Sequence, residues 1–177
     1  MSTSMAMVGL FWIAEGDVYV GAKPSGLAPG VRLTPEGVTA LGDGQSGLYL
    51  WEDVQSLTVA DVPVQSLRRQ IGAVKDLALG TVMDFALGSG RVGEAPPMVT
   101  ICVESAGGDH ELPAYVAAAL GYSQTEVDLS RALLARLTEG AATMATTLAA
   151  MSEWGRAWEG GSPRKAEREA LLREWAG

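Results

Sequence analysis

The spacing of apolar residues changes once along this 177-residue chain, and that change constrains the fold more than any other feature. Before residue 123 the apolar residues form short runs, several of them alternating with polar residues, between turn-forming residues, as in antiparallel strands. After residue 123 they recur with a period of about 3.6, which predicts helices. Strands first and helices last predict an α+β fold.

Two hairpins are predicted near the start of the chain. The segments 10–13 and 17–22 flank a tight turn at residues 15–16. The segment 31–41 contains Thr34-Pro35-Glu36-Gly37, with proline second and glycine fourth, as in a type I turn. Further strands are predicted at 48–51, at 55–60 and in a hairpin over 98–113 that turns at Gly107-Gly108. We expect the core to contain Trp12, Val18, Leu33, Leu50, Trp51, Leu57, Val59, Ile101 and Val103.

Helices are predicted in an insertion and at the C-terminal end. The segment 65–87 has apolar residues at helical spacing, as one helix or as two broken at Gly80, and a linker follows over 88–97. Ser123 to Glu126 form a capping-box pattern that begins a helix. Gly140 either divides the apolar stripe that follows or marks the close approach of another helix. Ser162 and Pro163 are expected as N-cap and first residue of a tail helix.

These segments divide the chain into three parts. Residues 1–122 form a β-rich domain with an insertion at about 65–97, residues 123–160 a helical extension, and residues 161–177 a tail helix. The extension packs either on this domain or on a partner.

Charge and composition exclude several classes of function. The chain has 13 basic and 21 acidic residues and a net charge of −8, so it should be repelled by nucleic acids and by anionic lipid. One cysteine and one histidine cannot form a disulfide or a usual structural zinc site. The apolar run 5–14 lacks the basic start of a signal peptide, and the run 71–87 carries three charges. We therefore expect a soluble cytoplasmic protein without stable membrane insertion.

Two motifs resemble catalytic or nucleotide-binding patterns. Gly88-Ser89-Gly90-Arg91-Val92-Gly93 has the letters of a dinucleotide-binding loop, but it follows a predicted helix and precedes a strand, so we interpret it as a linker. Cys102 and His110 could pair as nucleophile and base. In the predicted hairpin Ser105 faces His110 and Cys102 faces Pro113, which puts the thiol and the imidazole on opposite faces of the sheet.

Acidic pairs and aromatic residues have a structural interpretation as well as a functional one. Glu52, Asp53, Asp109 and Glu111 could serve a carboxylate-dependent hydrolase, but acids in an acidic chain are usually solvated. Trp51 before two acids favours a residue that seals the core over one that stacks on a ligand.

The segment from Val31 to Val38, and the run Leu48-Tyr49-Leu50-Trp51-Glu52-Asp53-Val54 that leads to Leu57, resemble the middle of a bacterial pleckstrin-homology-like (PH-like) domain. The resemblance covers residues 11–137, and the chain departs from the family by its insertion and its C-terminal extension. It implies a curled antiparallel sheet or open barrel plugged by a terminal helix. Members that bind phosphoinositides use basic residues in the first hairpin loop, where this chain has Glu15-Gly16-Asp17, so the resemblance favours protein binding and makes phosphoinositide binding unexpected.

We therefore expect a non-catalytic intracellular protein-interaction or assembly module that acts through apolar helical surfaces, with a carboxylate-dependent hydrolase, with or without a divalent metal, as the alternative. No catalytic residue, cofactor or metal ligand is assigned. The partner is a protein or a second copy of the chain. The helices after Gly140 either form this association surface or pack back on the same core. The expected partner-binding residues are Met144, Leu148, Met151, Trp154, Trp158, Leu171, Leu172 and Trp175.

Overall fold

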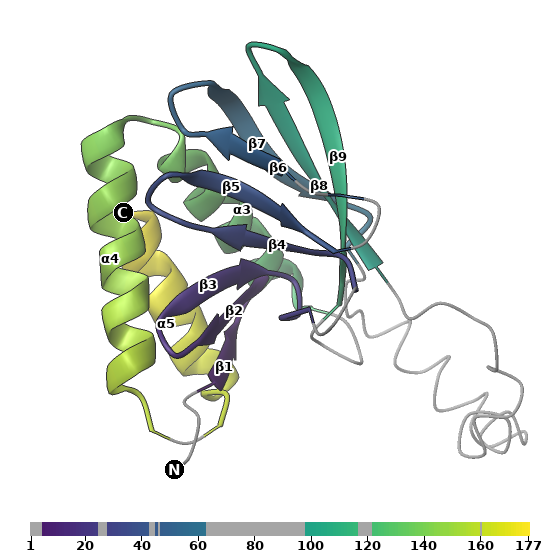
Figure 1. Cartoon of the computed structure of the whole chain (residues 1–177). Helices are drawn as coiled ribbons and strands as arrows, with labels where there is room; N and C mark the ends of the chain where they lie inside the picture. Colours follow the sequence, from purple (N-terminus) through teal and green to yellow (C-terminus); the bar gives the residue numbers. More distant parts are fainter. Residues whose placement is uncertain are drawn as a thin grey trace, which may run out of the picture.

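A computed structural model describes residues 5–24, 28–42, 45, 47–62, 98–116, 122–159 and 161–177. Over these residues the chain is α+β, with two antiparallel sheets and three helices (Figure 1). The predicted helix at 65–87 and the glycine-rich linker at 88–97 lie outside the described residues. None of the described helices is long and apolar enough to cross a membrane.

The first sheet is a six-stranded meander in which each strand pairs with the next one along the chain. Both predicted N-terminal hairpins are confirmed. The strand before them was not expected: the apolar run 5–14 breaks at Gly9, whose φ of 59° suits a turn, and so forms two paired strands. The strands are β1 (Met5–Val8), β2 (Phe11–Ala14), β3 (Asp17–Val20), β4 (Gly30–Leu33), β5 (Gly37–Leu41) and β6 (Gly47–Leu50).

The second sheet contains β7 (Val54–Ala60), β8 (Met98–Ser105) and β9 (Gly108–Tyr115). The predicted turn at Gly107-Gly108 is wrong, because Ser105 pairs with Gly108 and the turn is Ala106-Gly107. The pairing is displaced by two residues, so every side chain keeps its predicted face of the sheet.

Three helices follow the strands: α3 (Gln124–Leu137), α4 (Ala141–Ala157) and α5 (Lys165–Ala176). The predicted N-cap is confirmed, because the amide of Glu126 donates to Ser123 Oγ at 3.2 Å. The reciprocal half of the predicted capping box differs: the Glu126 carboxylate accepts from the Ser123 hydroxyl at 2.8 Å and not from the Ser123 amide. Gly140 divides the apolar stripe and is the N-cap of α4. The predicted tail helix is present, but its predicted start is wrong: the N-cap is Arg164, and Ser162 Oγ accepts instead from the Met7 amide on β1.

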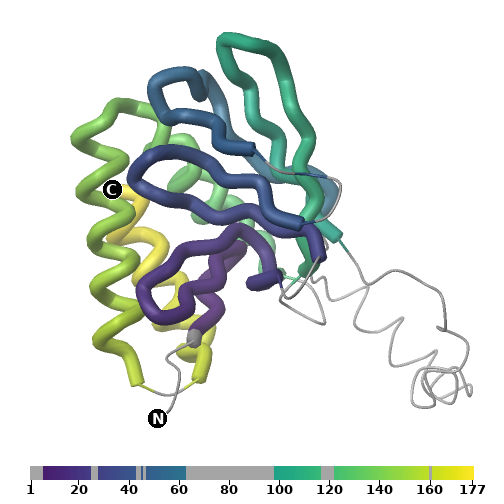
Figure 2. Tube along the Cα trace, in the orientation of Figure 1, coloured from purple at the N-terminus to yellow at the C-terminus, as the bar shows by residue number. Residues whose placement is uncertain are grey.

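One face of the six-stranded sheet is buried. α4 contacts β2 and β3, α5 contacts β1, and α3 contacts β7, so the helices lie along one side of the sheets (Figures 1 and 2). Most of the expected core residues are buried, but Trp12 and Trp51 are only half-buried. Leu50 is 38% exposed, so its placement in the core is wrong. It lies on the opposite face of β6 from Tyr49, which packs against the core.

Candidate functional site

Five of the eight expected partner-binding residues belong to this chain's own core. α4 packs back on β2 and β3, as in the second of the two arrangements considered for the helices after Gly140. Gly155 permits this contact, because a Cβ at that position would collide with Cγ2 of Ile13. The five buried residues cannot therefore line an exposed surface in this fold: they are Met144, Leu148, Met151, Leu172 and Trp175.

The other three residues, Trp154, Trp158 and Leu171, are half-buried. Trp154 stacks on Trp158 with ring centroids 5.2 Å apart and meets the edge of Trp175 at 5.7 Å. The Trp158 indole donates to the carbonyl oxygen of Gly161 at 2.8 Å. These contacts join the end of α4 to α5 and to the segment between them, which is a packing role.

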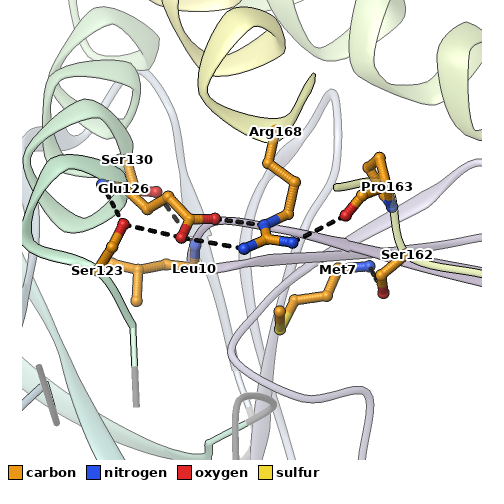
Figure 3. Close-up of polar contacts among 8 residues, drawn as sticks. All are labelled: Met7, Leu10, Ser123, Glu126, Ser130, Ser162, Pro163 and Arg168. Carbon is orange, nitrogen blue, oxygen red and sulfur yellow. Dashed lines mark hydrogen bonds and ion pairs between the residues drawn. The ribbon is translucent and has the colours of Figure 1, made fainter. Parts of the chain in front are cut away.

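A polar network fastens the helices to the first sheet (Figure 3). Arg168 of α5 binds Glu126 of α3, and its Nη1 also donates to the carbonyl oxygen of Pro163 at 2.8 Å. Ser130 Oγ accepts from the Leu10 amide at 3.1 Å and so serves the turn between β1 and β2. Every polar group in this network has a partner, and its chemistry is that of a structural clamp.

The single cysteine and the single histidine do not meet. Cys102 pairs across the sheet with Glu111, whereas His110 pairs with Val103 and so lies on the other face. Burial raises the pKa of the Cys102 thiol, and the nearby carboxylates of Glu111, Asp61 and Glu104 raise it further. A thiol that stays protonated is a poor nucleophile, so this pair carries no nucleophilic chemistry.

The carboxylates considered for a hydrolase are exposed at two places. Glu52 and Asp53 occupy the turn between β6 and β7, and Asp109 and Glu111 lie on β9. In the part of the chain that the structure describes, no three His, Cys, Asp or Glu residues are grouped so as to hold a metal ion.

The most distinctive surface lies at β6, the last strand of the six-stranded sheet, and the sequence did not point to it. Within the described residues, β6 pairs only with β5, so no strand is hydrogen-bonded to its outer edge. Leu48 and Leu50 project from this strand and are 45% and 38% exposed. They are the large apolar side chains exposed in the described chain. The signal was available, because an isolated Leu-Tyr-Leu alternation puts both leucines on one face and the tyrosine on the other.

Neighbouring residues hold this edge in place. Tyr49, on the opposite face from the two leucines, packs against His110 of β9 with ring centroids 4.6 Å apart. Trp51, just after the strand, donates from Nε1 to the carbonyl oxygen of Thr34 at 2.6 Å. Gly37 lies so close to β6 that a Cβ there would collide with the carbonyl oxygen of Tyr49. These contacts fix the place of the edge in the fold, and a binding surface needs such support.

Leu48 ends a row of residues that crosses the outer face of the sheet, opposite the buried face. Each residue is the direct partner of the next across the paired strands. The row runs Met7, Trp12, Tyr19, Arg32, Thr39 and Leu48. Burial raises the pKa of Tyr19, with a smaller contribution from the carboxylate of Asp17.

The charge beside the β6 edge is negative. Glu52 and Asp53 follow the strand directly and are exposed. Exposed Glu36 lies beside them, because its carbonyl oxygen accepts from the Trp51 amide at 3.3 Å. The candidate site is thus an apolar strand edge with an acidic border. Comparison of the chain with protein-family models, with curated proteins and with solved structures gives no match.

Proposed function

We propose that this protein is a non-catalytic protein-interaction module that binds an extended, basic segment of a partner along β6. The observation that carries the proposal is the pair Leu48 and Leu50, exposed on a strand whose outer edge is unpaired among the described residues. The proposal moves the binding surface from the C-terminal helices, whose apolar side chains the chain itself covers, to the edge of the sheet.

The backbone of β6 supplies part of the affinity in this proposal. A strand at a sheet edge presents N–H and C=O groups that an added strand can pair with. The strand has four residues, which is enough for a few main-chain hydrogen bonds but too few for strong binding by the backbone alone. The two leucines add apolar contact for side chains at alternate positions of the bound segment.

Charge selects the kind of partner. Glu36, Glu52 and Asp53 border the edge, so lysine or arginine in the bound segment gains attraction that speeds association and adds specificity. A second copy of this chain would bring the same acidic border and another net charge of −8. Repulsion therefore favours a basic segment of a different protein over self-association.

The proposal includes membership of the PH-like class. Two antiparallel sheets, followed by α3 after the last strand, are compatible with that class. The turn at Glu15-Gly16-Asp17 is acidic, so we do not extend the proposal to phosphoinositides. No described feature favours the hydrolase alternative over binding.

The direct test is a titration of the ¹⁵N-labelled full chain with a synthetic peptide of alternating lysine and valine. We expect saturable shifts of the β6 amides and little change at β1, the opposite edge of the same sheet. The same peptide with N-methyl groups on alternate residues has its charge and side chains but cannot pair with a strand on that side. Equal binding of the N-methylated peptide, or no saturable shifts at β6, would overturn the proposal.

Three double variants sharpen the test. Leu48→Thr with Leu50→Thr keeps strand propensity and removes the exposed apolar surface, and should weaken binding about tenfold. Glu52→Gln with Asp53→Asn should weaken binding and reduce its salt dependence, whereas Glu139→Gln with Glu159→Gln, exposed acids at the ends of other elements, should leave both unchanged.

A further inference from the structure

A pocket of about 350 Å³ lies between α4 and the ends of two hairpins of the first sheet. Its walls come from the β2–β3 turn, from the end of β4 with the turn that follows it, and from one side of α4. The pocket is separate from the β6 edge, and its size lies at the lower end of the range for small-molecule sites.

Small residues on α4 keep this space open. Ala145, Ala149 and Ser152 line the pocket at helical spacing, where larger side chains would fill the gap between the helix and the hairpins. Leu148 and Leu33 add apolar surface. The interior therefore suits the apolar body of a small molecule.

The polar groups of the pocket donate more hydrogen bonds than they accept. Two arginines, Arg32 and Arg156, line it with one carboxylate, Asp17. Arg32 Nη2 donates to Asp17 Oδ1 at 2.7 Å, while Arg32 Nε is buried without a hydrogen-bond partner. A guanidinium has five N–H donors, and Asp17, the one carboxylate of the pocket, is already paired with Arg32, so the donors of Arg156 remain available.

Arg156 supplies the unbalanced charge. Its side chain lies over Gly16, where a Cβ would stand 2.6 Å from Nη1, so the turn glycine makes room for the guanidinium. No hydrogen bond or ion pair connects the side chain of Arg156 with another described residue. Since Asp17 is already paired with Arg32, the pocket carries a net positive charge in a chain whose overall charge is −8.

We propose that this pocket binds a small, freely soluble organic anion, with an apolar body against α4 and a carboxylate or phosphate group held by Arg156. Guanidinium groups bind both anions through paired, charge-assisted hydrogen bonds. The inference goes beyond the proposed protein-binding function and does not depend on it.

The test uses the full chain with octanoate and phenyl phosphate as probes. Binding is measured by calorimetry and by the shift in melting temperature. Both probes should bind saturably at millimolar concentration. The neutral 1-octanol, which lacks the anion, and inorganic phosphate, which lacks the apolar body, should each bind about tenfold more weakly or not at all. Absence of saturable binding by both probes would overturn the proposal.

Variants then locate the binding. Arg156→Gln should weaken both probes about tenfold, whereas Arg173→Gln, which removes an exposed arginine from α5, should leave affinity unchanged. Ala149→Leu should fill the pocket and abolish binding without lowering the denaturation midpoint, since Ala149 is exposed. Equal affinity of the Arg156→Gln and Arg173→Gln proteins would show that the probes bind elsewhere. Co-sedimentation with phosphatidic acid vesicles, if lost in Arg156→Gln, would replace the soluble anion by a lipid head group.

Discussion

Arg168 and Glu126, 42 residues apart, join α5 to α3 through two hydrogen bonds, Nε to Oε1 at 2.5 Å and Nη2 to Oε2 at 3.3 Å. The Glu126 side chain is 4% exposed. Its carboxylate also accepts from the hydroxyl of the N-cap residue Ser123 at 2.8 Å, so the cap of α3 and the interhelical pair share one acid. The start of α3 is therefore tied to the orientation of α5.

Removal of Arg168 should leave the buried carboxylate of Glu126 with only a neutral hydrogen-bond donor, the hydroxyl of Ser123. We expect Arg168→Met to lower the free energy of unfolding by about 3 kcal/mol, near the lower end of the range for breaking a buried ion pair. Urea denaturation measures this change. Arg173→Met, on the exposed side of the same helix, should stay within about 0.5 kcal/mol of the parent protein.

The same ion pair predicts an acid dependence of stability. Burial alone would raise the pKa of Glu126, but hydrogen bonds from Arg168 and Ser123 and the positive charge of Arg168 outweigh it and lower the pKa below its ordinary value of 4.5. A depressed carboxyl pKa stabilises the folded state above the unfolded pKa, and this stabilisation is lost as the pH falls through the folded pKa.

The Glu126→Gln protein should therefore be less stable than the parent protein at neutral pH, and this difference in stability should become smaller in acid. The difference in unfolding free energy between the two proteins should be constant at neutral pH and should shrink below pH 4.5. Denaturant titrations at several pH values measure it. A gap that stays the same down to the acid limit of folding would contradict the lowered pKa.

Gly155 should be intolerant of a methyl group although it lies within a helix. Alanine favours helix by about 1 kcal/mol over glycine, but its Cβ would collide with Ile13 Cγ2 and push α4 from the sheet. We expect Gly155→Ala to be destabilising by about 1–3 kcal/mol in thermal unfolding. Ile13→Ala should relieve the clash. The double variant should therefore lose less unfolding free energy than the sum of the losses in the two single variants.

The burial of α4 predicts how a charged substitution behaves. Met151 is fully buried, so Met151→Glu together with Trp158→Glu should unfold the protein rather than leave a folded monomer. Circular dichroism with light scattering distinguishes these results. A folded, soluble double variant would show that the contact of α4 with the sheet is dispensable.

A buried leucine and an exposed leucine should differ in how much their replacement by alanine lowers stability. Leu57 of β7 is buried, and Leu57→Ala should cost about 2–5 kcal/mol. Leu48→Ala removes an equal number of atoms from an exposed leucine and should change stability by less than about 0.5 kcal/mol. Equal denaturation midpoints for the two variants would contradict the placement of β6 at an exposed edge.

Local signals in the sequence were sufficient for several elements. The Thr34 to Gly37 turn and the Ser123 N-cap are each determined by a few adjacent residues, because their hydrogen bonds close within three or four positions. The change of apolar period was likewise enough for the α+β class.

Other features depended on residues far apart in the chain. Ser162 has the chemistry of an N-cap, yet its hydroxyl serves the Met7 amide, 155 residues away. Leu50 is as apolar as any core residue, yet its direction follows from the pairing of β6 with β5 and from Tyr49 facing His110. The sequence by itself determined where most of the described strands and helices form, since those choices are made by neighbouring residues. Only the tertiary structure decided which apolar surfaces the chain covers and which it leaves exposed. Burial depends on contacts between segments that lie far apart in the sequence, and local sequence patterns do not specify those contacts.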